Sequence, residues 1–369
     1  MGLLMAFFPL ILKHCKARAW NNLMAATSFQ KDQGELLQRE AFLDPGVLPL
    51  YGSSELAKQI GAAPAIFFKH APTGFRVCPV GRPGNECFMI ALKLAALGKA
   101  IEGRKVGILL SSTWFCWDKS PPAFFYGNFS PLQGMSIVLS QDLSPELRKR
   151  LIQRMLDFPD LQLTEPVLGR CLKNAVREGE PDVSSRLLTS LLKCQHSMYV
   201  WEDGFNTAAA SFYVGRDGAD SSPRQSKSIN WEEHFEASKG PVPVPKEADG
   251  PTRAAVLGWM KVSQQWTDLE ILMDVLKSLG ARPIFLNIPL PPHYQGGMSL
   301  ESRAYYYQHL AELCRKHDMP LMNWQEHDGD MDFIMHHTAH YTHNGWMHVD
   351  QALDDFFHDR IQPPSAGRL

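Results

Sequence analysis

The stretch VLPLYGSSEL, residues 47–56, decides how this chain is expected to fold. Its first half is apolar and predicts a buried strand, and the residues GSS at 52–54 follow directly as a tight turn. Two more apolar runs, 75–80 and 105–111, also end at small or polar residues, with a helix expected over 86–98 between them. Strands that alternate with helices in this way predict an α/β fold built on a parallel sheet.

The same alternation returns near the C-terminus. Residues 282–288 and 319–324 predict two further strands, and a helix over about 301–317 connects them. The final helix shows one apolar face, made of Val349, Ala352, Leu353, Phe356 and Phe357. The expected fold is therefore a three-layer α/β domain over residues 41–362, with a parallel sheet flanked by helices.

The middle of the chain is expected to be a helical insertion. Ser144 and Pro145 are typical of a helix start, and Thr267 is expected to cap a helix further on. From 214 to 253 the chain is polar and rich in Gly, Ser and Pro. This composition predicts a long surface excursion, interrupted by a short helix near 231–237.

The composition is that of an ordinary globular protein. The 369 residues are 44% hydrophobic and 21% charged, with a formal net charge of −2, which excludes a disordered, collagen-like or coiled-coil class. A net charge this small gives no electrostatic reason to expect a nucleic-acid partner. Seven scattered cysteines without a CxxC pair argue against a disulfide framework and a zinc ribbon, and no cofactor is expected.

Residues 1–40 are expected to form a separate N-terminal segment. Residues 2–12, GLLMAFFPLIL, form an apolar run that is followed by a basic cluster. A helix that spans a bilayer needs about 17–25 apolar residues, so this run is too short to cross. Three interpretations stay open: a buried segment, an interfacial anchor, or the stub of a longer export helix.

A serine at the junction of a strand and a helix can be exposed above the sheet, where the turn also supplies a backbone N–H as half of an oxyanion hole. Ser53 and Ser54 occupy such a junction. A neutral hydroxyl needs a base, and histidine is the usual one. Five histidines fall within thirteen residues: His336, His337, His340, His343 and His348.

This density of histidines also suggests a metal site. Spacings of three and four can place several imidazoles on one helical face, but the run holds no carboxylate or cysteine at matching spacing. Asn344-Gly345 within it indicates a turn. We therefore expect no metal here, and we expect His336, His343 and His348 to be solvated loop residues.

Several segments, in chain order, resemble the DltD family, whose active-site region is similar to that of the SGNH/GDSL hydrolases. They are YGSSEL at 51–56, STWF at 112–115, NFSPLQ at 128–133, LSPELRKRLIQRMLDFP at 143–159, QWTDLEILMDVLKSLGARPIFL at 265–286 and HYTHNGWMHVDQALDDFF at 340–357. Together they extend over about residues 45–360. The resemblance implies an SGNH/GDSL hydrolase-like fold for the domain.

The resemblance also implies roles around the nucleophile. The third residue of the family's Gly-x-Ser pattern is the nucleophile, which selects Ser54 over Ser53. The N–H groups of Ser54 and Gly84 would form the oxyanion hole, with Gly81 as the neighbouring candidate. Thr113 would complete the hole at a position where related hydrolases place asparagine.

The expected base is His340, the histidine that precedes the Gly-Trp step by five residues. The family pattern usually places an aspartate three or four residues before it, and these positions here hold His337 and His336. The nearest preceding carboxylates are Asp332, Asp330 and Asp328, one of which could complete a triad, and Asp332 is our candidate. Otherwise a backbone carbonyl would orient His340 in a dyad, and loss of the aspartate weakens a triad by about 10⁴-fold in one case of a different fold.

The function that the resemblance implies is D-alanyl ester or thioester hydrolysis or transfer, in the D-alanylation of envelope polymers such as teichoic acid. The implied partners are a membrane O-acyltransferase and a D-alanyl carrier protein. The resemblance also implies a membrane-anchored protein on the periplasmic or extracellular side, for which residues 2–12 would be a shortened anchor.

Two other functions stay open. The chain could be a scaffold with weak or no turnover, which binds the carrier, the polymer or the membrane acyltransferase, or it could be a carbohydrate O-esterase. A cluster of aromatic residues could line a polymer groove, although about half of them are expected to be core. The cluster consists of Trp114, Phe115, Trp117, Phe124, Phe125 and Tyr126.

Overall fold

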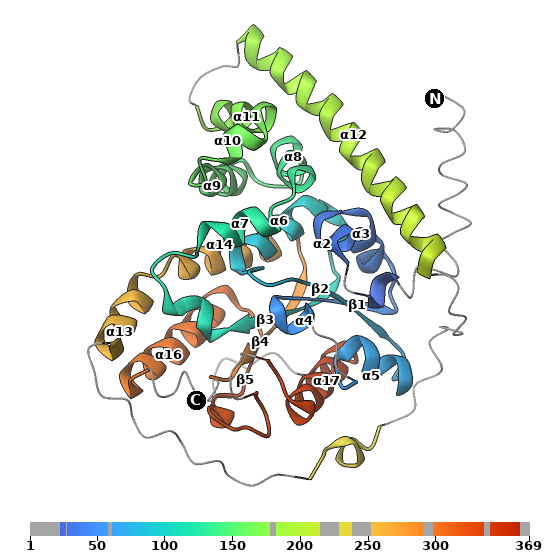
Figure 1. Ribbon diagram of the computed structural model, residues 1–369, viewed down its shortest axis with the longest axis vertical. Helices are drawn as coiled ribbons and strands as arrows, with labels where there is room; N and C mark the ends of the chain where they lie inside the picture. Colours follow the sequence, from blue (N-terminus) through green and yellow to red (C-terminus); the bar gives the residue numbers. More distant parts are fainter. Residues whose placement is uncertain are drawn as a thin grey trace.

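One parallel sheet forms the centre of the protein. The computed structural model describes residues 23–26, 28–57, 61–177, 182–214, 229–237, 252–290, 298–335 and 340–361. The sheet has five parallel strands in the order β2-β1-β3-β4-β5 (Figure 1). The strands are β1 (Val47–Gly52), β2 (Arg76–Gly81), β3 (Lys105–Ser111), β4 (Arg282–Ile288) and β5 (Leu321–Asn323). The predicted α/β fold with a parallel sheet is confirmed.

Helices connect the strands and make up most of the middle of the chain. In chain order they are α2 (Phe29–Gln33), α3 (Leu36–Leu43), α4 (Ser54–Ala57), α5 (Pro64–His70), α6 (Cys87–Leu97), α7 (Pro122–Asn128), α8 (Pro131–Leu139), α9 (Pro145–Leu156), α10 (Leu161–Thr164), α11 (Pro166–Val176), α12 (Val183–Val214), α13 (Thr252–Val262), α14 (Gln264–Ser278), α16 (Leu300–His317) and α17 (His343–Phe357). Short 3-10 helices are η1 (Gly98–Ile101), η2 (Ser112–Cys116), η3 (Trp231–His234) and η4 (Gln325–His327).

Helices cover both faces of the sheet, which gives the predicted three layers (Figure 1). Successive side chains of a strand point to opposite faces, so Val47 and Tyr51 enter one hydrophobic core while Leu48 and Leu50 enter the other. The first core is shared with α6 and α14, and the second with α5 and α17. Burial on both faces explains why the strands read as continuous apolar runs in the sequence.

The predicted helical insertion consists of α7 to α12. Its helix α9 begins as expected, because the Ser144 hydroxyl accepts the Leu147 N–H at 3.2 Å and Pro145 follows in the first turn. The prediction that Thr267 caps a helix is wrong. Helix α14 begins earlier, at Gln264, where the Ser263 hydroxyl accepts the N–H of Gln265.

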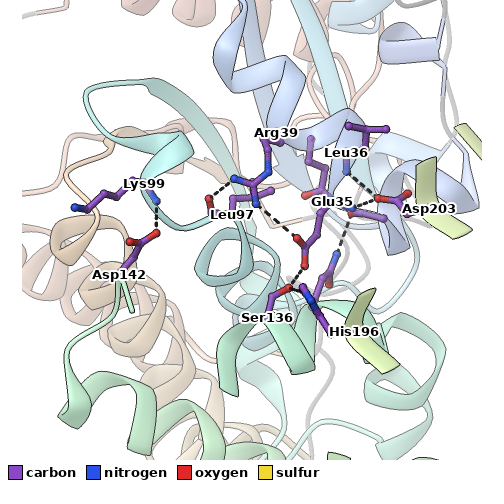
Figure 2. Close-up of polar contacts among 12 residues, drawn as sticks. Glu35, Leu36, Arg39, Leu97, Lys99, Ser136, Asp142, His196 and Asp203 are labelled. Carbon is purple, nitrogen blue, oxygen red and sulfur yellow. Dashed lines mark hydrogen bonds and ion pairs between the residues drawn. The ribbon is translucent and has the colours of Figure 1, made fainter. Parts of the chain in front are cut away.

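Helix α12 is the longest element of the insertion and runs along one side of the molecule (Figure 1). Its inner face is tied to the body by polar contacts (Figure 2). His196 Nε2 lies 2.8 Å from the Ser136 hydroxyl of α8, and Asp203 accepts the N–H groups of Glu35 and Leu36 at 2.8 and 2.9 Å. These bonds fix the helix to the start of α3 and to α8.

Parts of two predicted segments lie outside the described residues: residues 1–22 of the N-terminal segment, and residues 215–228 and 238–251 of the polar excursion. Between the last two, η3 is the short helix expected near 231–237. Its Trp231 ring stacks on Phe67 of α5 with centroids 5.5 Å apart. This part of the excursion therefore packs back onto the domain.

Candidate active site

Ser54 lies where the sequence predicts a nucleophile, directly after β1 at the carboxyl edge of the sheet. The strand order changes direction between β1 and β3, and in open α/β sheets ligands bind at this switch point. Ser54 is partly exposed, whereas Ser53 and Glu55 are each only 3% exposed. Of the two adjacent serines, Ser54 is thus the one that solvent and a substrate can reach.

The buried Ser53 links the turn of Ser54 to the loop that follows β2. Its hydroxyl donates to the backbone carbonyl of Arg82 at 3.2 Å, and the Asn85 amide donates to the carbonyl of Gly52 at 2.6 Å. Asn128 in turn donates to the carbonyl of Pro83 at 3.0 Å. The turn that carries Ser54 and the loop that follows β2 therefore hold each other in place. Sequence reasoning missed Asn85, because its partner is a backbone atom far away in the chain.

Glu55 stabilises the same turn through its buried side chain. Its Oε1 accepts the Ser53 N–H at 2.5 Å, and burial raises the pKa of this carboxyl to about 7. A Cβ at Gly52 would lie 2.3 Å from this oxygen, so any larger residue there would displace the Glu55 carboxyl. Burial, and the charge of Glu55, raise the pKa of the Tyr341 hydroxyl, which among the described residues has no hydrogen-bond partner.

His340 meets Ser54 at the sheet edge. Its Nε2 lies 3.0 Å from the Ser54 hydroxyl oxygen, within hydrogen-bond distance. A short antiparallel pairing positions this histidine: Ile334 bridges Tyr341, and the Met335 N–H donates to the His340 carbonyl at 2.8 Å. The structure thus brings together the serine and the histidine that the sequence singled out.

Asp332 lies in the turn that precedes the bridge between Ile334 and Tyr341. Its carbonyl accepts a hydrogen bond from the Thr342 hydroxyl, and its N–H donates to Asp330 at 2.9 Å. Asp330 also lies 3.0 Å from His327, and Asp328 is bound by Arg303 at 2.8 Å. These two carboxylates are therefore engaged elsewhere. Residues 336 and 337, at the usual aspartate positions, lie outside the described residues, and the role of Asp332 stays a prediction.

The candidates for the oxyanion hole lie at or just after the carboxyl ends of β2 and β3. Gly84 has a positive φ of 79°, and a Cβ there would come within 2.8 Å of the Phe124 ring, so both conformation and space favour glycine. Gly81 is the last residue of β2 and packs on the Gly52 carbonyl. Thr113 follows β3 in η2, with its hydroxyl 2.8 Å from that of Ser111. Their roles remain predictions.

The aromatic cluster after β3 divides as expected. Trp114, Phe115 and Phe125 are buried in the core, whereas Trp117 is 50% and Phe124 38% exposed. Phe124 lies against Gly84, so an exposed aromatic ring borders the loop of the candidate oxyanion hole. These two exposed rings are the part of the cluster that is available to a ligand.

The expectation that His343 and His348 are solvated loop residues is wrong. Both belong to α17, because the Thr342 hydroxyl caps this helix by accepting the Gly345 N–H at 3.2 Å. His343 bonds the His234 carbonyl at 2.8 Å, and His348 stacks on Phe333. Burial lowers the pKa of His348. His336 lies outside the described residues.

The described ranges contain neither a candidate metal site nor a membrane-spanning helix. No group of three or more His, Cys, Asp or Glu side chains in these ranges is arranged to hold a metal ion. Among the helices of the same ranges, none combines the length and the apolar character needed to cross a membrane. The apolar run 2–12 is not part of the described residues.

Sheet order and edge geometry define the class: an α/β protein of SGNH-like topology, with a serine–histidine pair at the carboxyl edge of its parallel sheet. The family model described as "DltD protein" matches residues 24–240 and 256–358. The chain therefore belongs to the DltD family.

Individual relatives agree with this assignment. The chain is 27% identical to Protein DltD of Bacillus subtilis (strain 168) over 343 residues, which are 88% of this chain and 86% of that protein. It is 20% identical to Protein DltD of Staphylococcus aureus (strain NCTC 8325 / PS 47) over 352 residues, 90% and 86% of the two chains. A shorter match, 27% identical over 142 residues, covers 38% of this chain and 33% of Protein DltD of Lacticaseibacillus rhamnosus.

Proposed function

We propose that this protein transfers or hydrolyses a D-alanyl ester or thioester, with Ser54 as the nucleophile and His340 as the base. The observation that carries the proposal is the 3.0 Å distance between the Ser54 hydroxyl oxygen and His340 Nε2. A hydroxyl in this contact can pass its proton to the imidazole while it attacks an acyl carbon. No cofactor is needed for this chemistry.

The proposed reaction has two halves. Ser54 Oγ bonds to the D-alanyl carbonyl carbon, the bond to the carrier sulfur or oxygen breaks, and His340 returns the proton to that leaving group. An acceptor hydroxyl or water, deprotonated by His340, then attacks the acyl-serine and releases Ser54. The N–H groups of Ser54 and Gly84, with Thr113, would stabilise the oxyanion in both halves.

The proposed setting follows from the family. D-alanine would pass from a carrier protein, through a membrane O-acyltransferase, to an envelope polymer such as teichoic acid. The protein would be membrane-associated and face the outside of the cytoplasm. The exposed rings of Phe124, which lies beside the Gly84 loop, and of Trp117 would contact the polymer or the carrier.

A serine-directed fluorophosphonate probe tests the proposal. We expect the probe to label the wild type and Ser53→Ala but not Ser54→Ala, and we expect release of D-alanine from a D-alanyl thioester to follow the same pattern. The neighbouring serine is the matched control, because both substitutions remove one hydroxyl from the same turn. Equal labelling and release in the wild type and Ser54→Ala would overturn the proposal.

A second candidate is a scaffold that binds the carrier, the polymer or the acyltransferase without turnover. The observation in its favour is that His336 and His337 stand where the family usually has the aspartate. The same probe separates the two candidates. An unlabelled wild type that still binds the D-alanyl carrier protein would support the scaffold.

A further inference from the structure

A cavity of about 260 Å³ lies at the amino edge of the sheet, the edge opposite Ser54. Val47, Lys105 and Arg282, which are the first residues of β1, β3 and β4, contribute to its lining. Since a strand rises about 3.3 Å per residue, the length of β1 separates this cavity from Ser54 by about 20 Å. The cavity is therefore distinct from the candidate active site.

Three cations line this cavity: Arg104, Lys105 and Arg282. Strand pairing brings them together, because Lys105 is in register with Arg282 and the Arg104 carbonyl accepts the Arg282 N–H at 2.8 Å. The chain as a whole has a formal net charge of −2. Positive charge is thus concentrated locally, at the start of two neighbouring strands.

Two of these cations already hold one anionic oxygen between them. Asp359 Oδ1 lies 2.6 Å from the Arg282 guanidinium and 2.8 Å from Lys105 Nζ. The Asp359 side chain is 62% exposed, so this pairing contributes little to stability. Lys105 also donates to the Phe357 carbonyl at 2.8 Å, which leaves the third N–H of its ammonium for a ligand.

The carboxylates nearby do not balance the cations. Asp44, which also lines the cavity, is engaged by Arg76 at 2.7 Å and by the Gly46 N–H at 2.8 Å. The half-buried Arg104 side chain forms no ion pair or hydrogen bond among the residues that the structure describes. Four cations, with Arg76 included, face Asp44 and Asp359, so two positive charges have no counter-charge.

We propose that this cavity binds the phosphate group of a small phosphate monoester. At neutral pH such a group carries a charge of about −1.5 to −2, which matches the two unbalanced cations, whereas a carboxylate carries only one charge. Guanidinium groups also match phosphate oxygens in paired hydrogen bonds. One phosphate oxygen would take the place of Asp359 Oδ1 between Lys105 and Arg282, and Arg104 would bind another.

The apolar part of the lining accounts for the rest of the ligand. Phe42 and Val47 are buried, and Pro45 and Phe357 complete the apolar wall. A volume of about 260 Å³ is slightly below the range of roughly 300–1,000 Å³ for ligand pockets. The cavity therefore suits a phosphate with a short organic substituent that packs on this wall.

Titration calorimetry of the full chain with n-propyl phosphate tests the proposal. The wild type should bind it more tightly than inorganic phosphate, which lacks the apolar group, and more tightly than acetate, which has less charge. Binding should weaken as salt is added. Ser54→Ala should bind equally well, so the result is independent of the proposed acyl chemistry.

Charge substitutions locate the site. Arg104→Gln should raise the dissociation constant of n-propyl phosphate by about tenfold or more, because it removes charge-assisted hydrogen bonds. The matched control is Arg170→Gln on α11, which removes the same charge from an exposed position outside the cavity. Asp359→Asn should lower the constant by a few-fold, since it removes the competing carboxylate. Circular dichroism verifies that each variant folds.

A further arm identifies the source of the phosphate. Sedimentation with phosphatidic acid vesicles that Arg104→Gln reduces and Arg170→Gln does not would assign the site to a lipid headgroup. Binding of n-propyl phosphate without such sedimentation would assign it to a free phosphate ester. Three results would overturn the proposal: no binding of n-propyl phosphate at millimolar concentration, equal weakening by Arg104→Gln and Arg170→Gln, or acetate binding as tight as that of n-propyl phosphate.

Discussion

The two halves of the candidate site are built in different ways. The turn that carries Ser54 is fixed by Glu55 from within the turn, and by Ser53 and Asn85, which bond it to the loop after β2; all three residues are buried. The segment that carries His340 depends on one short antiparallel pairing and on the cap of α17. The nucleophile is thus held by three hydrogen bonds of buried residues, and the base by one short pairing and a helix cap. We therefore expect a destabilising substitution to displace His340 more readily than Ser54.

The largest effect is expected from His340→Ala. This change removes the base and leaves the turn of Ser54 intact, so the rate of fluorophosphonate labelling should fall by about 10²–10⁴-fold. The melting temperature should change little, because His340 is only half-buried. A labelling rate close to that of the wild type would show that Ser54 does not depend on this imidazole.

The next largest effect is expected from Gly345→Ala, in the segment that carries His340 (the base segment). A Cβ at Gly345 would collide with the Phe333 carbonyl oxygen, which pairs with the Thr342 N–H at 3.0 Å. We expect a loss of about 2–4 kcal/mol in the free energy of unfolding, together with slower labelling of Ser54.

Gly127→Ala in α7 is the matched control for this substitution, since nothing lies within 4 Å of the added carbon. This change should be neutral or stabilise by up to about 1 kcal/mol. Chemical denaturation of both variants measures the difference. If Gly345→Ala and Gly127→Ala were equally stable, the base segment would be able to accommodate the added methyl group without loss.

The pH dependence of stability tests the buried Glu55. Burial raises its pKa from 4.5 to about 7, so the folded chain holds this proton more tightly than the unfolded chain does. Stability should therefore fall as the pH rises from about 4.5 to 7, by up to about 3 kcal/mol from this group.

Glu55→Gln removes this titration. The melting temperature of the variant relative to the wild type should increase between pH 5 and pH 8, as followed by thermal scans. In Glu55→Gln, the loss of stability with rising pH should be smaller than in the wild type. It should not disappear, because burial also raises the pKa of Glu35 and of Glu86 to about 7. A difference independent of pH would argue against a protonated Glu55 in the folded state.

The smallest effect is expected from Ser53→Ala. The change removes one hydrogen bond, to the Arg82 carbonyl at 3.2 Å, so the loss of stability should be about 1 kcal/mol. Labelling of Ser54 should slow by a few-fold only, since Asn85 still joins the turn to the loop. Complete loss of labelling would instead assign the reactive hydroxyl to Ser53.

The same contrast explains what could be predicted from the sequence. The strands, the turn of Ser54 and the cap at Ser144 were predictable, because apolar runs and capping residues act over neighbouring positions. The contact of Asn85 with Gly52 was not, because it depends on how distant segments meet. The assignment of His343 to a loop failed for another reason: two local signals conflict here, and the Thr342 cap prevails over the turn signal of Asn344-Gly345.

The separation of Ser54 and His340 along the chain has a consequence for biosynthesis. They are 286 residues apart, and β4, β5 and α17 are all made after the first three strands. At about 5–20 residues per second, the ribosome delivers the expected base roughly 15–60 s after the serine. For that time the nascent chain would carry a nucleophile without its proton acceptor. Ser54 should therefore be unreactive until α17 has packed beside the sheet.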